Sequence, residues 1–421
     1  MLQPTTRSLV LAVAVFAGSH LLIAEETPTP TLVRSDAPGW PQWRGPDRSG
    51  LCEEKGLLGE WPDDGPKQQW TVSGIGRGYA SPIVVGDTIY IPGDGDEELS
   101  ISALSLDGKL RWQITNGAVW TRSHPGARAA CCYDEGKLYQ LNAHGRLACF
   151  DTTNGAELWA VDVLDRFEAK NITWGISESV LVDGDLVFVT PAGAKALMAA
   201  LDKKTGDTVW AADPLEGEQA SYSSPVLLDV GEKRLVVNSG SQHAFAVDAR
   251  TGKIFRQMRH LDPDRTITTT PILTSNGVVF TNASRYFGGV FCAGSGGQAA
   301  ERLWSADLKI SHGGAICVAD SVFGMSSRGA AKGWVRIDSA TGEATALNDH
   351  PAGSLVYADN RFYCLTERGT MTLQKLDGER FTETGSFQLA EGKDIWTHPV
   401  ICNGRLLLRH HDTLYCYDIR R

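Results

Sequence analysis

The feature that most constrains the fold of this chain is a short motif that recurs along it. Its clearest copy is residues 201–210, which read LDKKTGDTVW, and residues 150–159 read FDTTNGAELW. A third copy, residues 247–255, reads VDARTGKIF, with Phe255 in place of the tryptophan. Successive units are roughly 36–51 residues apart, a period that suits four short strands per unit. The repeat therefore predicts the blades of a β-propeller.

Each part of the repeat has a physical role in such a blade. Asn-Gly or Gly-Asp pairs between apolar runs supply the positive φ of tight hairpins. The aspartate followed by Thr-Gly forms the next turn. The tryptophan that follows is expected to fill the wedge between neighbouring blades, because a large ring buries much apolar surface.

The last repeat is incomplete. It begins at Trp396 and stops at Tyr417-Asp418, before a fourth strand, whereas residues 67–70 (KQQW) resemble a single outer strand. We therefore predict an all-β fold: an eight-bladed β-propeller of four-stranded antiparallel blades, with an N-terminal strand closing the last blade. Closure of the ring removes exposed sheet edges.

Length and composition agree with one large domain over residues 40–421. The chain has 421 residues, of which 42% are hydrophobic, so it can bury a large core and is not disordered. Its length alone would suggest two or three domains, but the repeat joins them into one. The formal net charge is −10 and no basic run stands out. We therefore expect no nucleic-acid partner.

The N-terminus is typical of an exported protein. Residues 1–24 contain Arg7 and then an apolar stretch from Leu9, which predicts a cleaved signal peptide. Residues 25–39 are expected to be a linker. The sequence thus predicts a secreted or periplasmic protein with no transmembrane segment after cleavage. The nine cysteines form no C-x-x-C motif and are interpreted as small buried hydrophobic residues.

The repeat motif resembles the pyrroloquinoline-quinone (PQQ) repeat. Residues 40–50, WPQWRGPDRSG, followed by residues 60–62, EWP, are similar to the start of secreted bacterial PQQ-like propellers. The family includes quinoprotein alcohol dehydrogenases and the non-enzymatic lipoprotein that assists outer-membrane β-barrel assembly. The resemblance spans residues 40–421 and implies the fold, whereas the repeat builds blades and does not define an active site.

Loops that lead into the innermost strands of a propeller converge on the mouth of its central channel. Aromatic rings there could stack on a planar or sugar-like molecule, and cations could orient an anionic group; alternatively, they only cap strands. Four histidines lie in these loops: His124, His312, His350 and His398. They come from blades spread around the ring, so we expect no single metal site. The predicted ligand-binding residues are Arg77, Tyr79, Arg122, His124, Arg128, Trp174, Tyr222, His312, His350, Trp396 and His398.

A member of the dehydrogenase branch would also need groups that hold a cofactor and a base. The resemblance implies a quinone chelated to calcium, which needs carboxylate and amide oxygens and a carboxylate base. Glu178 is the only acid in these loops and would be that base or ligand. In some family dehydrogenases an adjacent cysteine pair forms a disulfide ring over the quinone. Cys131 and Cys132 could form such a vicinal disulfide or be two small apolar residues of a strand.

The sequence favours a non-catalytic binding or scaffolding module. It would bind a protein segment or a small molecule at the channel mouth and is expected to need no cofactor. The alternative is a PQQ-dependent dehydrogenase that oxidises an alcohol or sugar, with PQQ and calcium bound. A role in barrel assembly is a third possibility, but the first cysteine is Cys52, so none follows the signal peptide to carry a lipid.

Overall fold

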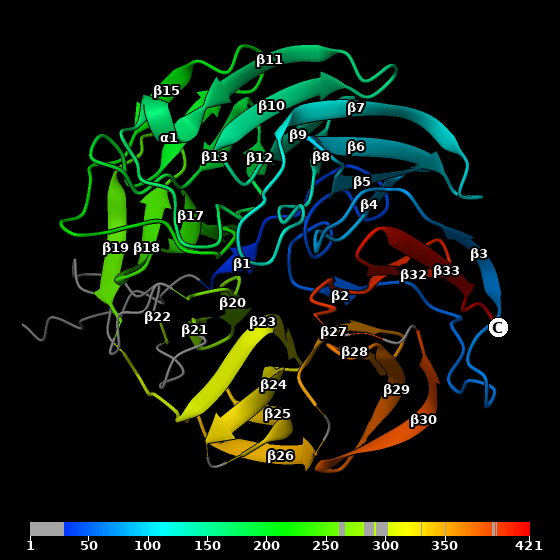
Figure 1. Cartoon of the computed structure of the whole chain (residues 1–421). Coiled ribbons are helices and arrows are strands. Elements are labelled where there is room, and N and C mark those ends of the chain that lie inside the picture. The colour runs from blue at the N-terminus through cyan, green and yellow to red at the C-terminus, as the bar shows by residue number, and fades with distance from the viewer. Residues whose placement is uncertain are drawn as a thin grey trace, which may run out of the picture.

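Antiparallel sheets surround a central axis in the computed structural model of the chain, which is a β-propeller (Figure 1). The structure describes residues 29–260, 266–281, 290–291, 302–329, 331–349, 351–389, 392 and 394–421. The predicted signal peptide, residues 1–24, lies outside the described residues. Among those described, no helix is long and apolar enough to cross a membrane.

The first half of the ring contains four blades, and one short helix, α1 (Val163–Arg166), follows the second. The first blade is β4 (Ile83–Val85), β5 (Thr88–Asp94), β6 (Glu98–Ser105) and β7 (Leu110–Ala118). The second is β8 (Cys132–Asp134), β9 (Lys137–Leu141), β10 (Arg146–Asp151) and β11 (Glu157–Asp162). The third is β12 (Leu181–Asp183), β13 (Leu186–Val189), β14 (Ala199–Asp202) and β15 (Thr208–Ala211). The fourth is β16 (Val226–Val230), β17 (Lys233–Ser239), β18 (His243–Asp248) and β19 (Ile254–Arg259).

The second half begins with a three-stranded sheet and continues with three blades. The sheet is β20 (Ile272–Thr274), β21 (Gly277–Val279) and β22 (Val290–Phe291). The next blade is β23 (Leu308–Val318), β24 (Ser321–Gly329), β25 (Gly333–Asp338) and β26 (Ala344–Asn348). It is followed by β27 (Gly353–Ala358), β28 (Arg361–Thr366), β29 (Thr370–Asp377) and β30 (Arg380–Gln388). The last blade is β31 (Val400–Cys402), β32 (Arg405–His410), β33 (Thr413–Asp418) and the N-terminal β3 (Gln68–Val72).

The prediction of eight four-stranded blades is wrong, because only seven sheets among the described residues have four or more strands. The sheet β20–β22 has only three strands among the described residues, and its strands are two or three residues long. The sequence of this unit also differs from the others, since residues 292–301 contain no aspartate, whereas an aspartate ends or follows the third strand of the other units: Asp107, Asp151, Asp202, Asp248, Asp338 and Asp377. An all-β propeller of four-stranded blades is otherwise confirmed.

The predicted closure of the ring is confirmed. Strand β3 pairs antiparallel with β33, placing Trp70 opposite Cys416. The sheet order β3-β33-β32-β31 makes the N-terminal strand the outermost strand of the last blade. The first and last parts of the chain are therefore held in one sheet.

The motif tryptophans connect neighbouring blades, as predicted. The Nε1 of Trp159 donates to the backbone carbonyl of Lys203 at 3.0 Å. Its ring lies against Gly206, where an added Cβ would be 2.7 Å from the ring. Gly206 has φ +76, which suits glycine and leaves room for the indole. The same bond to the next turn is made by Trp70, Trp112, Trp210 and Trp304.

The N-terminal chain runs through the middle of the ring before it reaches β3. Strand β1 (Thr31–Leu32), within the predicted linker, pairs with the innermost strand β16. Trp40 bridges to Val84 in β4, and β2 (Leu51–Cys52) pairs parallel with β27. Figure 1 shows β1 and β2 inside the ring of blades. Residues 40–50, here called the plug segment, therefore occupy the central channel.

Candidate functional site

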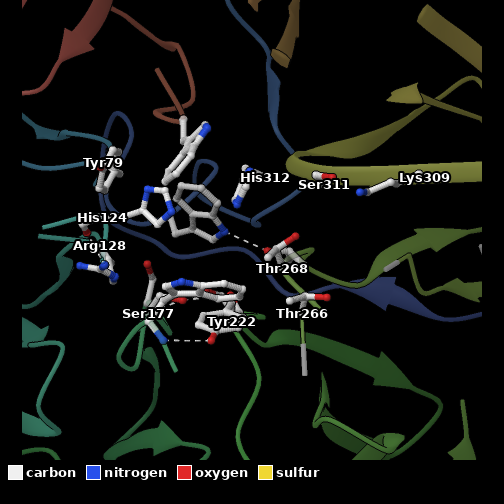
Figure 2. A pocket seen from close by; sticks show the side chains of 16 residues that line it. Tyr79, His124, Arg128, Ser177, Tyr222, Thr266, Thr268, Lys309, Ser311 and His312 are labelled. Carbon is white, nitrogen blue, oxygen red and sulfur yellow. Dashed lines mark hydrogen bonds between the residues drawn. The ribbon is translucent and has the colours of Figure 1, made fainter. Parts of the chain in front are cut away.

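A cavity of about 340 Å³ lies at the channel mouth, with Trp43 of the plug segment in its wall (Figure 2). Its lining consists of aromatic, hydroxyl and basic side chains, without a carboxylate among the described residues. The aromatic residues are Trp43, Tyr79, Trp174, Tyr222 and Trp396. The hydroxyl residues are Ser177, Ser179, Ser224, Thr266, Thr268, Thr270 and Ser311, and the basic residues are His124, Arg128, Lys309 and His312.

Trp396 is the centre of an aromatic cluster in one wall. The imidazole of His312 stacks on its ring, with centroids 4.4 Å apart and an interplanar angle of 17°. The rings of Tyr79 and His124 lie 4.7 Å and 5.0 Å from it. Thr397 also donates its hydroxyl to the Tyr79 carbonyl, so the two blades that meet here are fixed together. This wall is a preorganised apolar surface.

Arg128 braces the loop that carries His124. Its guanidinium donates to the carbonyls of His124 and Gly126 and lies 5.2 Å from the ring centroid of Trp120. Burial lowers the pKa of Arg128 to about 10, so it stays protonated at neutral pH. His124 has a positive φ of 55°, a conformation that such bracing helps to hold. Arg128 is therefore a positioning residue with much of its donor capacity already used.

The basic part of β23 lies on the same side of the cavity as Trp396, because His312 belongs to this strand. Lys309, Ser311 and His312 follow one another along this strand, and Figure 2 shows the nitrogen end of Lys309 directed toward Ser311. Within the described part of the chain, the Lys309 ammonium has no ion pair. The His312 Nδ1 lies 3.7 Å from an oxygen of Glu367. This wall therefore presents a cation that has no ion pair with the residues that the structure describes.

The glycine after His312 lets this strand approach its neighbour. A Cβ on Gly313 would be 1.7 Å from the carbonyl oxygen of Gly353 in β27. No other residue fits without moving one of the two blades. The Nε2 of His398 also lies 2.9 Å from the His312 carbonyl oxygen. The close contact between these blades thus fixes where His312 enters the cavity.

Figure 2 shows Tyr222 across the cavity from Tyr79 and His312, and its ring centroid is 5.6 Å from that of Trp174. The Tyr222 hydroxyl accepts a bond from the Trp174 backbone at 3.2 Å. Trp174 is itself only half-buried. Because its backbone, not its ring, makes the bond, the indole remains able to contact a ligand.

The plug segment forms the floor. Trp43 donates its Nε1 to the Thr270 hydroxyl at 2.9 Å, and its ring lies 4.6 Å from His398. Arg44, the next residue, donates to the carbonyls of Arg48 and Ala315. Burial lowers the pKa of Arg44 to about 10. A protonated guanidinium therefore lies close to the floor of the cavity.

Arg48 fixes the plug segment to the blades. It is 1% exposed and donates to three backbone carbonyls, those of Ser179, Val180 and Pro225. Its Nε donates to the Gln42 side chain at 2.9 Å. These carbonyls lie just before the innermost strands of two blades. Arg48 therefore satisfies backbone groups that would otherwise be buried without partners.

The structure brings seven of the predicted ligand-binding residues together in the cavity lining: Tyr79, His124, Arg128, Trp174, Tyr222, His312 and Trp396. Three others lie elsewhere. Arg77 is exposed, Arg122 lies 5.6 Å from the Trp120 ring centroid, and His398 is buried beneath Trp43. Their loops belong to the same set, but these side chains are not part of the cavity lining. His350 lies outside the described residues.

The sequence did not predict that Trp43 forms the floor of the cavity or that Lys309 lines it. Trp43 was visible only as part of a family-like N-terminal segment, and the repeat gave no signal that this segment enters the channel. Lys309 lies two residues before the loop position that the repeat identifies. Its extension toward the channel depends on the length of β23, which has 11 residues. The serine and threonine hydroxyls occur in the expected loops but were too common to single out.

The dehydrogenase prediction depends on Glu178, which does not line the cavity. Its side chain is 3% exposed, and it accepts a bond from the Thr190 backbone at 3.0 Å. Burial raises the pKa of Glu178 to about 8, although this bond and nearby Arg48 favour the charged form. Cys131 and Cys132 are free buried thiols and lie outside the lining.

The residues of the cavity do not fit a calcium-chelated quinone. Calcium prefers several oxygen ligands, usually including carboxylates, and the described lining has none. Across the described residues, no group of three or more His, Cys, Asp or Glu side chains could hold a metal ion. We therefore derive no chemical step through the quinone.

Comparison with known proteins identifies the family. The PQQ_2 family, described as "Outer membrane protein assembly factor BamB", matches residues 98–346, more than half of the chain. The chain belongs to this family, which confirms the resemblance found in the sequence. Membership establishes a PQQ-like repeat propeller and does not by itself decide between binding and redox chemistry.

Two curated relatives represent both branches. The chain is 27% identical over 147 residues to the dehydrogenase subunit of the quinone alcohol dehydrogenase of Acetobacter aceti, covering 31% of this chain and 19% of that protein. It is 28% identical over 149 residues to the outer membrane protein assembly factor BamB of Kangiella koreensis, covering 35% and 33%. The chain therefore spans a third or less of the length of these relatives.

A solved structure agrees with the fold. The quinohemoprotein alcohol dehydrogenase from Comamonas testosteroni superposes with a TM-score of 0.63 at 12% identity, over 91% of this chain and 80% of that chain. At this identity the likeness concerns the fold alone.

Proposed function

We propose that this chain is a non-catalytic binding propeller and that it holds its ligand in the cavity at the channel mouth. The observation that carries the proposal is the composition of the lining, in which aromatic, hydroxyl and basic side chains surround a cavity without a described carboxylate. Such a site has groups for stacking, hydrogen bonding and charge pairing. The groups of the described lining that could accept a proton include the imidazoles of His124 and His312, and no carboxylate base is among them.

The size of the cavity limits the ligand. A volume of about 340 Å³ is near the lower end of the range for small-molecule sites. It suits a single ring or one residue of a polymer. A protein segment would fit only by inserting one side chain, so a small molecule or the end of a polymer is the better candidate.

The location of the protein is part of the same proposal. Residues 1–24 have the pattern of an export signal, and one relative is named as an outer membrane assembly factor. We infer that the chain acts outside the cytoplasm. N-terminal sequencing of the protein recovered from an envelope or culture fraction should begin after the predicted signal.

Tryptophan fluorescence tests the binding role. The full chain and its Trp174→Ala variant would be titrated with neutral sugars, sugar acids, aromatic acids and short peptides. We expect saturable binding of at least one class by the wild type and at least tenfold weaker binding by the variant. Trp61→Phe, which changes a tryptophan buried beside Tyr363 and away from the cavity, is the matched control.

A second assay addresses the dehydrogenase alternative. The protein would be incubated with PQQ and calcium and then mixed with alcohols or sugars and an artificial electron acceptor. We expect no substrate-dependent reduction of the acceptor. Steady reduction of the acceptor that is lost in Glu178→Gln would contradict the proposal and support a quinone-dependent dehydrogenase.

A further inference from the structure

The cavity contains more hydroxyl side chains than an aromatic ligand alone would use. Seven of its sixteen lining residues are serine or threonine, and they come from successive loops around the mouth. Four of these hydroxyls already bond the protein: that of Ser177 donates to the Tyr222 carbonyl, and those of Ser179, Ser224 and Thr270 accept from N–H groups. A hydroxyl can make one donor and two acceptor bonds, so the set still matches a ligand that donates and accepts at several positions. A ring that bears several hydroxyl groups has this property.

The aromatic residues agree with such a ring. Trp43 in the floor and Trp174 in the wall both present half-buried indoles to the cavity. The C–H face of a pyranose can lie flat on an indole and remove apolar surface from water. The volume also agrees, because about 340 Å³ is near the lower end of the range for small-molecule sites and has room for one pyranose ring.

The ionisable side chains of the described lining are basic or tyrosine, whereas the Glu367 carboxylate, 3.7 Å from His312, lies outside the lining. Arg128 uses its guanidinium on backbone carbonyls, whereas Lys309 has no ion pair among the described residues. Lys309 lies beside Ser311 and His312 on the same wall. Below the floor, the guanidinium of Arg44 donates to carbonyl oxygens and has no hydrogen bond to a carboxylate within the described chain. An anionic group of the ligand would therefore be stabilised at the Lys309 side.

We propose that the cavity recognises a pyranose ring that carries a carboxylate, as in a hexuronic acid. The ring lies against Trp43 and Trp174, the hydroxyls face the serine and threonine side chains, and the carboxylate pairs with Lys309. The ligand is either a free sugar acid or the terminal residue of an acidic polysaccharide, since both present the same chemistry at an open mouth. This inference rests on the proposed binding function and gives its ligand class.

Titration calorimetry with the full chain tests the ligand class. The probes are D-galacturonate and D-glucuronate, the uncharged methyl ester of galacturonate, D-galactose and benzoate. We expect at least one uronate to bind, with the ester and the neutral sugar at least tenfold weaker, and benzoate weaker still. A trigalacturonide separates the two sources: binding as tight as that of the monomer or tighter supports a polymer end, and much weaker binding supports the free acid.

Variants of one lysine test the position of the carboxylate. Lys309→Met should reduce uronate affinity about tenfold, to the level of the methyl ester, and leave the ester unchanged. Lys375→Met, at an exposed strand position outside the cavity, is the control and should bind like the wild type. If Lys309→Met does not fold, Lys309→Gln serves the same comparison.

The outcomes separate this inference from the binding function. Equal affinity for uronate and its neutral ester would overturn the carboxylate assignment, and tighter binding of benzoate would overturn the sugar assignment. In both cases the cavity would still bind a ligand. Absence of binding by every sugar probe would overturn the inference. The Trp174 fluorescence comparison with the other ligand classes would then decide separately whether the binding function stands.

Discussion

The plug segment and the cavity above it both contain basic residues, but the partners of these residues differ. In the plug segment, Arg48 is fully buried and bonds three backbone carbonyls and Gln42. In the cavity, Lys309 is half-buried and has no ion pair among the described residues. A basic residue near the axis of this propeller is therefore structural where backbone oxygens accept its hydrogen bonds. It is available to a ligand where they do not.

The tryptophans show the same contrast. The Nε1 of Trp43 is bonded to Thr270 and its ring packs on His398, so it connects the plug segment to the ring. Trp174 uses only its backbone to bond Tyr222. Substitutions in the plug segment should therefore reduce stability, and those in the cavity wall should mainly reduce binding.

The largest effect is expected for Arg48→Met. Loss of the guanidinium leaves three buried carbonyls without donors, which should lower the free energy of unfolding by roughly 3–5 kcal/mol. Urea denaturation followed by circular dichroism measures this loss. Arg122→Met, at an exposed position, is the control and should change stability by less than about 0.5 kcal/mol. If the Arg48 variant and the wild type had the same free energy of unfolding, the plug segment would not stabilise the fold through Arg48.

Glu178→Gln tests whether the Glu178 carboxyl, which lies near Arg48, is protonated in the folded protein. The folded-state pKa of Glu178 is about 8, above the ordinary 4.5. The folded protein thus keeps a proton that the unfolded chain releases, so this carboxyl stabilises the fold below pH 4.5, and the contribution is lost as the pH rises toward 8. The variant should match the wild type at pH 5 and exceed it at pH 9, by on the order of a few kcal/mol.

Denaturation curves of both proteins across pH 5–9 measure that difference. Glu379→Gln, at an exposed turn, is the control and should run parallel to the wild type. If the Glu178 variant also ran parallel, the carboxyl would be ionised in the folded state, and its assignment as a buried neutral group would fail.

Trp43→Ala should have an intermediate effect, because Trp43 belongs to both regions. Removing the indole deletes its bond to Thr270 and its contact with His398. For a half-buried tryptophan we expect a loss of about 2 kcal/mol in stability, together with a loss of ligand binding. Unfolding and fluorescence titration of the same sample measure both. Loss of only one of the two properties would show that Trp43 belongs to one region alone.

The smallest stability effect is expected for Trp174→Ala. The ring is half-buried and makes no side-chain hydrogen bond to any residue that the structure describes, so the variant should lose about 1 kcal/mol or less. Binding should nevertheless fall at least tenfold. A melting temperature close to that of the wild type, together with weakened binding, would sharpen the comparison. A large loss of stability would place Trp174 with the structural residues instead.

The repeat predicted the fold well because its parts act locally. Trp159 and Gly206 meet as the spacing of the motif requires, and the orphan strand at residues 67–70 closes the ring. The blade count was wrong where the motif decays. In the unit of the sheet β20–β22 no aspartate occurs in residues 292–301, after the third strand, so counting units by spacing overestimated the number of four-stranded blades.

The site was predicted in part, because side-chain direction is not encoded in loop position. Tyr79 and His312 enter the cavity from loops that the repeat located. His398 comes from an equivalent loop but is covered by Trp43, and Arg77 points to solvent. Both outcomes depend on the plug segment and on neighbouring blades, which are long-range contacts. The sequence alone contains no period that reports them.

The most direct test of the central claim is the calcium dependence of quinone binding. The claim is that this cavity holds its ligand with aromatic, hydroxyl and basic side chains, and not through a chelated metal. Calorimetric titration of the purified chain with PQQ, once with calcium and once with EDTA, compares the two. We predict the same weak or absent binding in both. Tight stoichiometric binding that requires calcium would contradict the account and assign the protein to the quinone-dependent dehydrogenases.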